Sequence, residues 1–264
     1  MNPHPLDVLF ARCRSEGRAA LVGYLPAGYP DKDTAVAALR AMVEAGVDAV
    51  EVGIPYSDPL LEGSVIAAAH ERALAGGTRT ADVLDTVRAV ADTGAPTLVM
   101  GYWNPVHRYG FARWAADLRA AGGVGAITPD LIPEEAAEWL AATEAEGLAP
   151  VFLVAPSSTD ERIAVVGRAN RGFVYAAAVM GVTGARASVG AGARDLVRRV
   201  RAQTGLPVAV GLGVSTGAQA AEVAGFADGV VVGSALVSAL AERGVEGVRR
   251  LAAELADGVR APRP

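Results

Sequence analysis

The feature that most constrains this chain is the alternation of eight short apolar runs with longer amphipathic segments. Each run is almost continuously apolar, which is typical of parallel strands covered on both faces. Strands that alternate with helices build either a closed barrel or an open, doubly wound sheet. The predicted strands are 19–25, 49–54, 96–102, 124–128, 149–155, 172–178, 207–213 and 228–233.

Length and glycine placement favour the barrel. No GxGxxG pattern follows the first run, whereas glycine-rich turns follow the last two runs. A (β/α)8 barrel typically needs about 250 residues, so a chain of 264 residues is expected to form one such domain over 1–264. Residues 5–17, before the first run, predict an extra N-terminal helix that covers the barrel floor.

Composition argues against several classes of partner and site. The net charge is −5 and no basic patch with interleaved aromatic residues occurs, so nucleic-acid binding is not expected. No apolar stretch is long enough for a membrane span, and no secretory signal is visible, so a cytoplasmic location is expected. His4, His70 and His107 lack metal-ligand spacing, so no metal site is predicted. Cys13 is expected to be an ordinary helix residue.

Lysine usage excludes another kind of chemistry. Lys32 is the only lysine, and it lies beside Asp31 and Asp33, either of which can cap a helix. A Schiff-base aldolase, or an enzyme that holds pyridoxal phosphate covalently, needs a lysine in its pocket. Lys32 is therefore predicted to be a solvated residue of a first helical turn.

Two glycine turns near the end of the chain predict a phosphate site. The seventh run ends in GLGVS (211–215), and the eighth ends at Gly233 followed by Ser234. Glycine lets a phosphate oxygen approach backbone N–H groups, and the following helix N-terminus favours an anion. The alternative is a pair of ordinary tight turns, but loops after strands 7 and 8 are the usual phosphate site of such barrels. A third glycine-rich loop, GVTGA (181–185), adds to this prediction.

Glu51 is the leading candidate for proton transfer. It alternates with Val50 and Val52 on the second run, which points its side chain into the barrel mouth. Burial there raises a carboxyl pKa toward the range useful for acid–base work. A structural carboxylate paired with arginine is the alternative, but the predicted strands carry no arginine. The following loop adds Asp58 and Glu62.

Several polar residues lie at or just past other strand ends. Tyr175 either holds a polar group of a substrate or fills the barrel interior, and the sequence leaves both open. Asp130 either contributes to the site or serves as a turn or cap residue. The others on this predicted rim are Tyr24, Tyr102, Asn104 and Thr183.

Ordered motifs along the chain resemble those of the tryptophan synthase α subunit family. They are EVGIPYSDP, PDLIPEE, VAPSSTDERI, GFVYAAAVMGVTGAR, GLGVS and VGSAL, and together they cover essentially the whole sequence. The resemblance implies a lyase that cleaves indole-3-glycerol phosphate into indole and glyceraldehyde 3-phosphate by a retro-aldol step. That step needs a proton for indole C3, a base for the glycerol hydroxyl and a partner for the indole N–H.

The resemblance also implies residue roles. Glu51 matches the main acid/base, and Glu62 stands where the family has an aspartate that binds the indole nitrogen. Tyr175 and Tyr102 are expected at the substrate, and Thr183 is expected to close the GVTG loop against the loop of Asp58. The indole pocket is expected to include Tyr24, Met100, Ile127 and Leu212, and the phosphate cradle Gly184, Gly213, Gly233 and Ser234.

The chain departs from the family pattern at a few positions. Glu62 is one methylene longer than the usual aspartate, so its carboxylate must retract or the loop must shift. Gly101 and Met180 replace residues that are commonly threonine, and Ala67 stands where a polar residue is usual. The loop of Asp58 belongs to the contact with a partner subunit in the family, so these changes bear on coupling as well as catalysis.

The implied assembly is αββα, in which a β subunit carries pyridoxal phosphate and this chain carries no cofactor. Two alternatives are a free-standing indole-releasing lyase and a weakly active α-like partner that regulates a β subunit. A sugar-phosphate isomerase barrel is disfavoured, because those of histidine synthesis place catalytic aspartates on opposed strands. Here the first run ends in Tyr24-Leu25-Pro26, without an aspartate.

Overall fold

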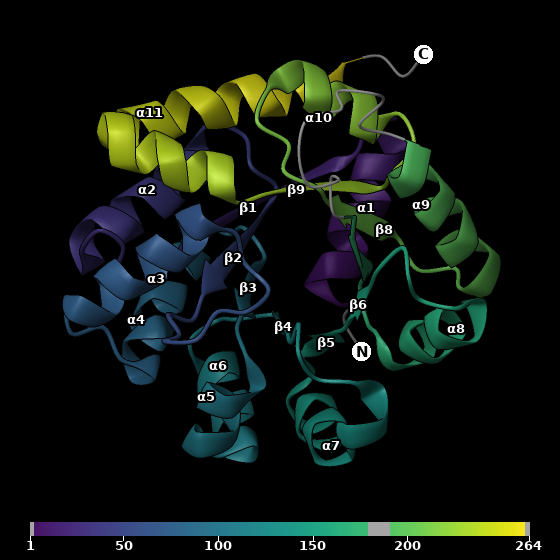
Figure 1. The fold of residues 1–264 in the computed structure, drawn as a ribbon, viewed down its shortest axis with the longest axis horizontal. Helices are drawn as coiled ribbons and strands as arrows, with labels where there is room; N and C mark the ends of the chain where they lie inside the picture. Colours follow the sequence, from purple (N-terminus) through teal and green to yellow (C-terminus); the bar gives the residue numbers. More distant parts are fainter. Residues whose placement is uncertain (1–2, 179–190, 262–264) are drawn as a thin grey trace.

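The computed structural model describes residues 3–178 and 191–261, which form a barrel of parallel strands surrounded by helices (Figure 1). Within these residues the sheet order is β5-β4-β3-β2-β1-β9-β8-β7-β6, and every pairing is parallel. The strands are β1 (Ala20–Pro26), β2 (Ala49–Gly53), β3 (Thr97–Met100), β4 (Gly125–Ile127), β5 (Ala149–Val151), β6 (Leu153–Val154), β7 (Val174–Ala177), β8 (Val208–Gly211) and β9 (Gly229–Val232).

The fifth predicted strand, 149–155, is divided in the structure. β5 and β6 are separated by Phe152 alone and lie at the two ends of the sheet order, so the chain itself closes the ring. The side-chain amide of Asn170 accepts from the Phe152 N–H at 2.8 Å and donates to its carbonyl at 3.0 Å. Because Asn170 takes both backbone groups of Phe152, the ladder is interrupted there. The run therefore gives two short strands that share one position in the barrel.

The helices lie around the outside of the strands (Figure 1). Most connect successive strands, as the (β/α)8 pattern predicts. The α-helices of the described residues are α1 (Pro5–Ser15), α2 (Lys32–Glu44), α3 (Ser64–Ala75), α4 (Thr80–Ala91), α5 (Trp103–Tyr109), α6 (Phe111–Ala120), α7 (Ala137–Glu146), α8 (Asp160–Ala169), α9 (Ala191–Gln203), α10 (Gly217–Ala224) and α11 (Ser234–Arg260). A 3-10 turn, η1 (Pro133–Glu135), precedes α7.

Helix α1 confirms the predicted extra N-terminal helix. Its buried side chains are Leu6, Leu9, Phe10 and Cys13, and they pack with inward-facing strand residues such as Val22. His4, before α1, contacts the carbonyl of Val124 at 3.0 Å through Nε2. Since Val124 immediately precedes β4, α1 covers the N-terminal end of the barrel and leaves the opposite end for a site.

The surface position of the only lysine is also as predicted. Asp31 caps α2 by accepting from the Thr34 N–H at 2.8 Å, and Lys32 is in the first turn. Lys32 pairs with Asp82 at 2.8 Å and its side chain is 55% exposed. No helix within residues 3–178 and 191–261 is long and apolar enough to cross a membrane.

Candidate active site

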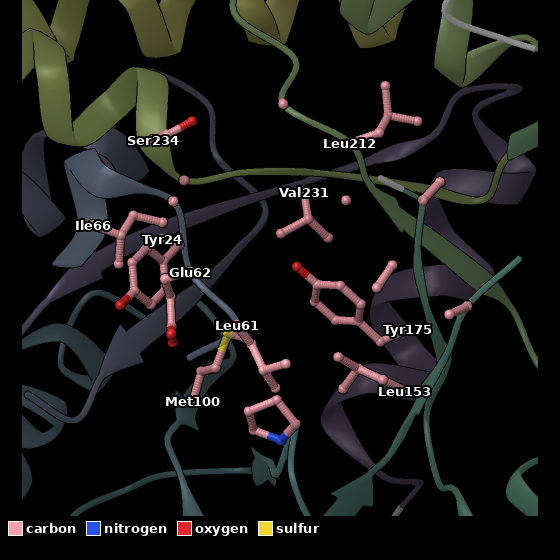
Figure 2. Close-up of a pocket in the computed structure, with 18 of the residues that line it drawn as sticks. Tyr24, Leu61, Glu62, Ile66, Met100, Leu153, Tyr175, Leu212, Val231 and Ser234 are labelled. Carbon is pink, nitrogen blue, oxygen red and sulfur yellow. The ribbon is translucent and has the colours of Figure 1, made fainter. Parts of the chain in front are cut away.

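A cavity of about 650 Å³ opens at the C-terminal ends of the strands, opposite α1. Residues from β1, β2, β3, β6, β7, β8 and β9 and from the loop after β2 form its wall, so the barrel brings together positions far apart in the sequence (Figure 2). The wall includes Tyr24, Glu51, Leu61, Glu62, Gly63, Ile66, Met100, Leu153, Tyr175, Gly211, Leu212, Gly213, Val231, Gly233 and Ser234.

Glu51 lies in this wall with its side chain directed inward. It pairs in register with Tyr24 on β1 and with Leu98 on β3, and it is 0% exposed. Neither carboxylate oxygen has a hydrogen-bond partner among the residues that the structure describes. Burial raises the pKa of Glu51 to about 8, because the charged form loses its hydration and gains nothing in return. At neutral pH this carboxyl is therefore mostly protonated and can donate a proton.

Arg18, the buried arginine of the described residues, pairs with Asp48 and not with Glu51. Arg18 binds Asp48 at 2.7 Å and Glu16 at 2.5 Å, near the N-terminal end of β2. The side chain of Arg18 is 9% exposed, and that of Asp48 is 4% exposed. The structural interpretation of a buried carboxylate with an arginine thus applies to Asp48, and Glu51 is a carboxyl of a different kind.

The second acid of the wall, Glu62, lies on the loop between β2 and α3. Tyr102 donates a hydrogen bond from its hydroxyl to the Glu62 carboxylate and accepts one from the Leu61 N–H at 2.8 Å. Glu62 is half-buried, and burial raises its pKa while the Tyr102 hydroxyl opposes that rise. The ring of Tyr102 stacks on Tyr56 at 4.9 Å. Tyr102 therefore fixes both the loop backbone and the acid on it.

Tyr175 enters the cavity from the opposite side, and its hydroxyl points toward the middle of the cavity (Figure 2). It lies on β7 in register with Ala209 on β8. A Cβ atom on Gly211 would lie 2.7 Å from the Tyr175 hydroxyl, so the glycine at the end of β8 makes room for the phenol. Of the two interpretations of Tyr175, a polar contact inside the cavity fits this placement.

The aromatic side of the wall contains a pair that the sequence analysis missed. Tyr24 and His70 are joined by a hydrogen bond of 2.8 Å between the phenol oxygen and Nε2, and both side chains are buried. His70 lies on α3, 46 residues after Tyr24, so only the folded structure brings the two together. The inward positions Leu153 and Val231 also belong to the wall, and strand alternation was the signal that could have found them.

Two glycine turns and a helix start form one end of the cavity. Gly213 follows β8 with a φ of +75°, a conformation that glycine adopts without strain, and a Cβ there would meet nothing within 4 Å. Gly233 follows β9 and precedes Ser234, the first residue of α11. These elements can bind an anion through backbone N–H groups, the Ser234 hydroxyl and the α11 dipole. Thr183 and Gly184 lie outside the described residues.

Three expected site residues of the described part of the chain do not line the cavity: Tyr102, Ile127 and Asp58. Ile127 is 0% exposed in the barrel interior, packed with the cluster that includes Leu98. Asp58 is exposed on the loop after β2 and accepts a hydrogen bond of 2.6 Å from Ser57. Asp130 accepts from the Trp103 N–H at 2.8 Å, so it binds the first residue of α5, 27 residues earlier, and not the helix that follows it. The described residues contain no group of three or more potential metal ligands.

Comparison with protein families places the whole barrel in a known group. The family model described as "Tryptophan synthase alpha chain" matches residues 10–260. The tryptophan synthase alpha chain of Mycobacterium avium is 58% identical over 255 residues, which cover 97% of this chain and 94% of the relative. That of Thermobifida fusca is 58% identical over 259 residues, covering 95% and 96%.

Solved structures agree with the sequence comparison. A structure of Mycobacterium tuberculosis tryptophan synthase superimposes with a TM-score of 0.93 at 56% identity, covering 98% of this chain and 99% of that chain. The tryptophan synthase subunit alpha of Legionella pneumophila gives a TM-score of 0.87 at 32% identity, covering 98% and 99%. The fold of this chain thus resembles that of solved tryptophan synthase structures.

Proposed function

The chain belongs to the tryptophan synthase alpha chain family, whose members are lyases of tryptophan biosynthesis, and we propose that the cavity of Glu51 is where it cleaves indole-3-glycerol phosphate. The products are indole and glyceraldehyde 3-phosphate. The proposal includes a single barrel domain over residues 1–264. The single observation that carries it is a fully buried carboxyl, without a hydrogen-bond partner among the described residues and with a raised pKa, in a cavity whose wall also includes Gly213, Gly233 and Ser234.

Glu51 is the acid and then the base of the proposed reaction. Its carboxyl proton passes to indole C3, and the ring becomes an electron sink for the bond that must break. The resulting carboxylate accepts the proton of the glycerol hydroxyl as the C–C bond breaks and the aldehyde forms. One proton enters the carbon and one returns to Glu51, so the enzyme ends in its starting state.

Glu62 is the proposed partner of the indole N–H. Its carboxylate already accepts a hydrogen bond from Tyr102 and retains further acceptor positions for a ligand. Positive charge develops at the indole nitrogen when C3 is protonated, so a nearby carboxylate stabilises the transition state more than the ground state. Tyr24, Met100 and Leu212 are the apolar wall for the ring, and Ile127 contributes from behind the wall.

The glycine turns are the proposed anchor for the substrate phosphate. Gly213, Gly233 and Ser234 lie at the end of the cavity where α11 begins, and Gly184 is expected to join them. Tyr175, which lines the cavity, is a proposed polar contact of the substrate, and Tyr102, which is bonded to Glu62, is proposed as a second. Closure of the site by Thr183 against Asp58 remains part of the proposal, because it excludes water from the proton transfers.

Tryptophan synthase alpha chains work with a beta chain, and we propose that this chain forms an αββα assembly with one. Pyridoxal phosphate belongs to the partner in this proposal, and this chain needs no cofactor for its own step. The exposed Leu60 and Leu61, on the loop of Asp58, support a partner contact there. A cytoplasmic location is proposed for the assembly.

The test is an assay of the purified chain on indole-3-glycerol phosphate with and without a tryptophan synthase beta chain. Indole release that rises when the beta chain is added supports the proposed role. Full activity that is unchanged by the beta chain would select the free-standing lyase, and no release under either condition would contradict the proposed reaction. The comparisons contain nothing that favours the free-standing or the regulatory alternative.

A further inference from the structure

The hydrogen bond between Tyr24 and His70 joins a strand of the cavity wall to helix α3. Tyr24 lies on β1 and lines the cavity, whereas His70 lies on α3, and their polar atoms are 2.8 Å apart. Tyr24 is 5% exposed and His70 is 2% exposed. A buried polar bond between two elements costs desolvation unless its geometry is kept, so the pair fixes the phenol in one position.

The position of the Tyr24 phenol depends on Gly53, which lies close to Glu51 on β2. Gly53 is two residues after Glu51 on β2, so both positions face the same side of the sheet. A Cβ atom on Gly53 would lie 2.3 Å from the Tyr24 hydroxyl oxygen. The Tyr24 phenol therefore occupies the space that the side chain of any other residue at position 53 would fill.

The hydrogen-bonding state of His70 follows from its burial. Burial lowers the pKa of His70 to about 4, so the imidazole is neutral at physiological pH and carries one N–H. Its Nδ1 is buried and has no hydrogen-bond partner within residues 3–178 and 191–261. An orphaned buried N–H is rarer than an orphaned acceptor, so the proton is assigned to Nε2. Nε2–H then donates to the Tyr24 oxygen, and the phenol keeps its own proton for an acceptor in the cavity.

We propose that His70 is a positioning residue of the aromatic subsite, holding the Tyr24 phenol over Gly53 as a fixed wall for the indole ring of the substrate. This inference rests on the proposed function, because it assigns the cavity an indole ligand. Figure 2 shows Tyr24 on the side of the cavity where Glu62 also lies, across from Tyr175. An indole ring bound between these walls would contact the Tyr24 phenol. His70 fixes the orientation of that phenol through the hydrogen bond and does not itself contact the ligand.

Calorimetric binding of two probes separates the subsites. Indole reports the aromatic wall, and glycerol 3-phosphate reports the glycine cradle. His70→Ala is expected to weaken indole binding about tenfold, the typical effect of losing one buried hydrogen bond, while leaving glycerol 3-phosphate binding within about twofold. His70→Gln is expected to restore most of the indole affinity, because its amide N–H can donate to the phenol.

A double-mutant cycle identifies the route of the effect. If His70 acts through Tyr24, then His70→Ala in a Tyr24→Phe background causes no further loss of indole affinity. Should His70→Ala fail to fold, His70→Asn serves the same cycle. Its amide reaches only about as far as Nδ1, so it keeps a polar group but loses the bond to Tyr24.

His4→Ala is the matched control. His4 is also a buried histidine, and it binds the backbone at the Val124 carbonyl (3.0 Å) and at the Leu6 N–H (3.3 Å), but it lies at the α1 end of the barrel. His4→Ala is expected to lower the melting temperature without changing indole affinity. A role of His70 in stability alone would give the same result for His70→Ala.

Two results would overturn the inference. One is unchanged indole affinity in His70→Ala, and the other is an equal loss whether residue 24 is tyrosine or phenylalanine. Failure of the proposed function itself has a different signature. The unmodified chain would then bind neither probe, or release no indole from indole-3-glycerol phosphate with or without a beta chain.

Discussion

The two acids of the cavity, Glu51 and Glu62, are set in opposite kinds of structure. Glu51 is on β2, 0% exposed and without a hydrogen-bond partner in the described part of the chain. Glu62 is on the loop before α3, half-buried and bonded to Tyr102. Burial raises the pKa of both acids, but at Glu62 the Tyr102 hydroxyl opposes the rise by stabilising the charged form.

This difference separates two tasks that one carboxyl cannot perform at the same pH. A proton donor must be protonated when the substrate binds, whereas a partner for an indole N–H must be an acceptor. Environments that move two carboxyl groups apart in protonation state are a recurring way to assign such roles. Substitutions that shorten or neutralise each acid in turn therefore test whether the tasks are divided as proposed.

The largest expected effect is that of Glu51→Gln. The amide keeps the shape but donates no proton to carbon, so turnover of indole-3-glycerol phosphate is expected to fall at least about a thousandfold. Steady-state indole release measures it. Glycerol 3-phosphate affinity is the control and should be unchanged, because the glycine cradle is intact. Turnover close to that of the unmodified chain would remove Glu51 from the mechanism.

A smaller loss is expected for Glu51→Asp, which keeps the acid and withdraws it by one methylene. β2 is hydrogen-bonded on both sides, to β1 and β3, so the strand cannot move to compensate. Displacement by about an ångström can cost about a hundredfold in rate. The drop is expected in kcat rather than KM, and a rate equal to that of Glu51→Gln would show that position matters as much as acidity.

Tyr102→Phe tests the loop acid through its partner. The ring can still stack on Tyr56, but the hydroxyl no longer binds Glu62 or the Leu61 N–H. A loss of about tenfold in kcat/KM is expected, since one hydrogen bond that positions Glu62 is removed. The melting temperature serves as a control for the fold. An unchanged kcat/KM would mean that Glu62 does not depend on Tyr102.

Glu62→Asp has the smallest expected effect and is the matched counterpart of Glu51→Asp. It restores the residue usual in the family, and the loop can shift because Leu61, Glu62 and Gly63 are outside the sheet. Activity is expected to be maintained or to rise. A collapse of indole release on this change would show that the longer side chain is required, and that the substrate or its geometry differs from the proposal.

The inward orientation of Glu51 was predictable from the sequence, whereas the environment of Glu62 was not. Alternation with Val50 and Val52 was enough to direct Glu51 into the barrel, because the side-chain period of a strand is fixed. The bond between Glu62 and Tyr102 spans 40 residues and depends on how a loop folds over a strand end. No periodicity reports such a contact.

The same contrast explains the other differences between prediction and structure. Burial of the strands and the start of α11 at Ser234 follow from local apolar patterns and glycine turns. The division of 149–155 into two strands follows from Asn170, which lies 18 residues away from Phe152 in sequence. The Tyr24–His70 pair likewise needs the packing of α3 on β1, which only tertiary structure supplies.

The most direct test of a protonated acid in the barrel mouth is a carbon NMR titration of glutamate carboxyl groups in the labelled protein, with Glu51→Gln used to assign the signal. The carboxyl signal that disappears from the spectrum of Glu51→Gln is the signal of Glu51. It is expected to titrate with a midpoint near pH 8, because burial raises the pKa of Glu51 to about 8. A midpoint near the ordinary glutamate value, about 4.3, would contradict the assignment of Glu51 as the proton donor.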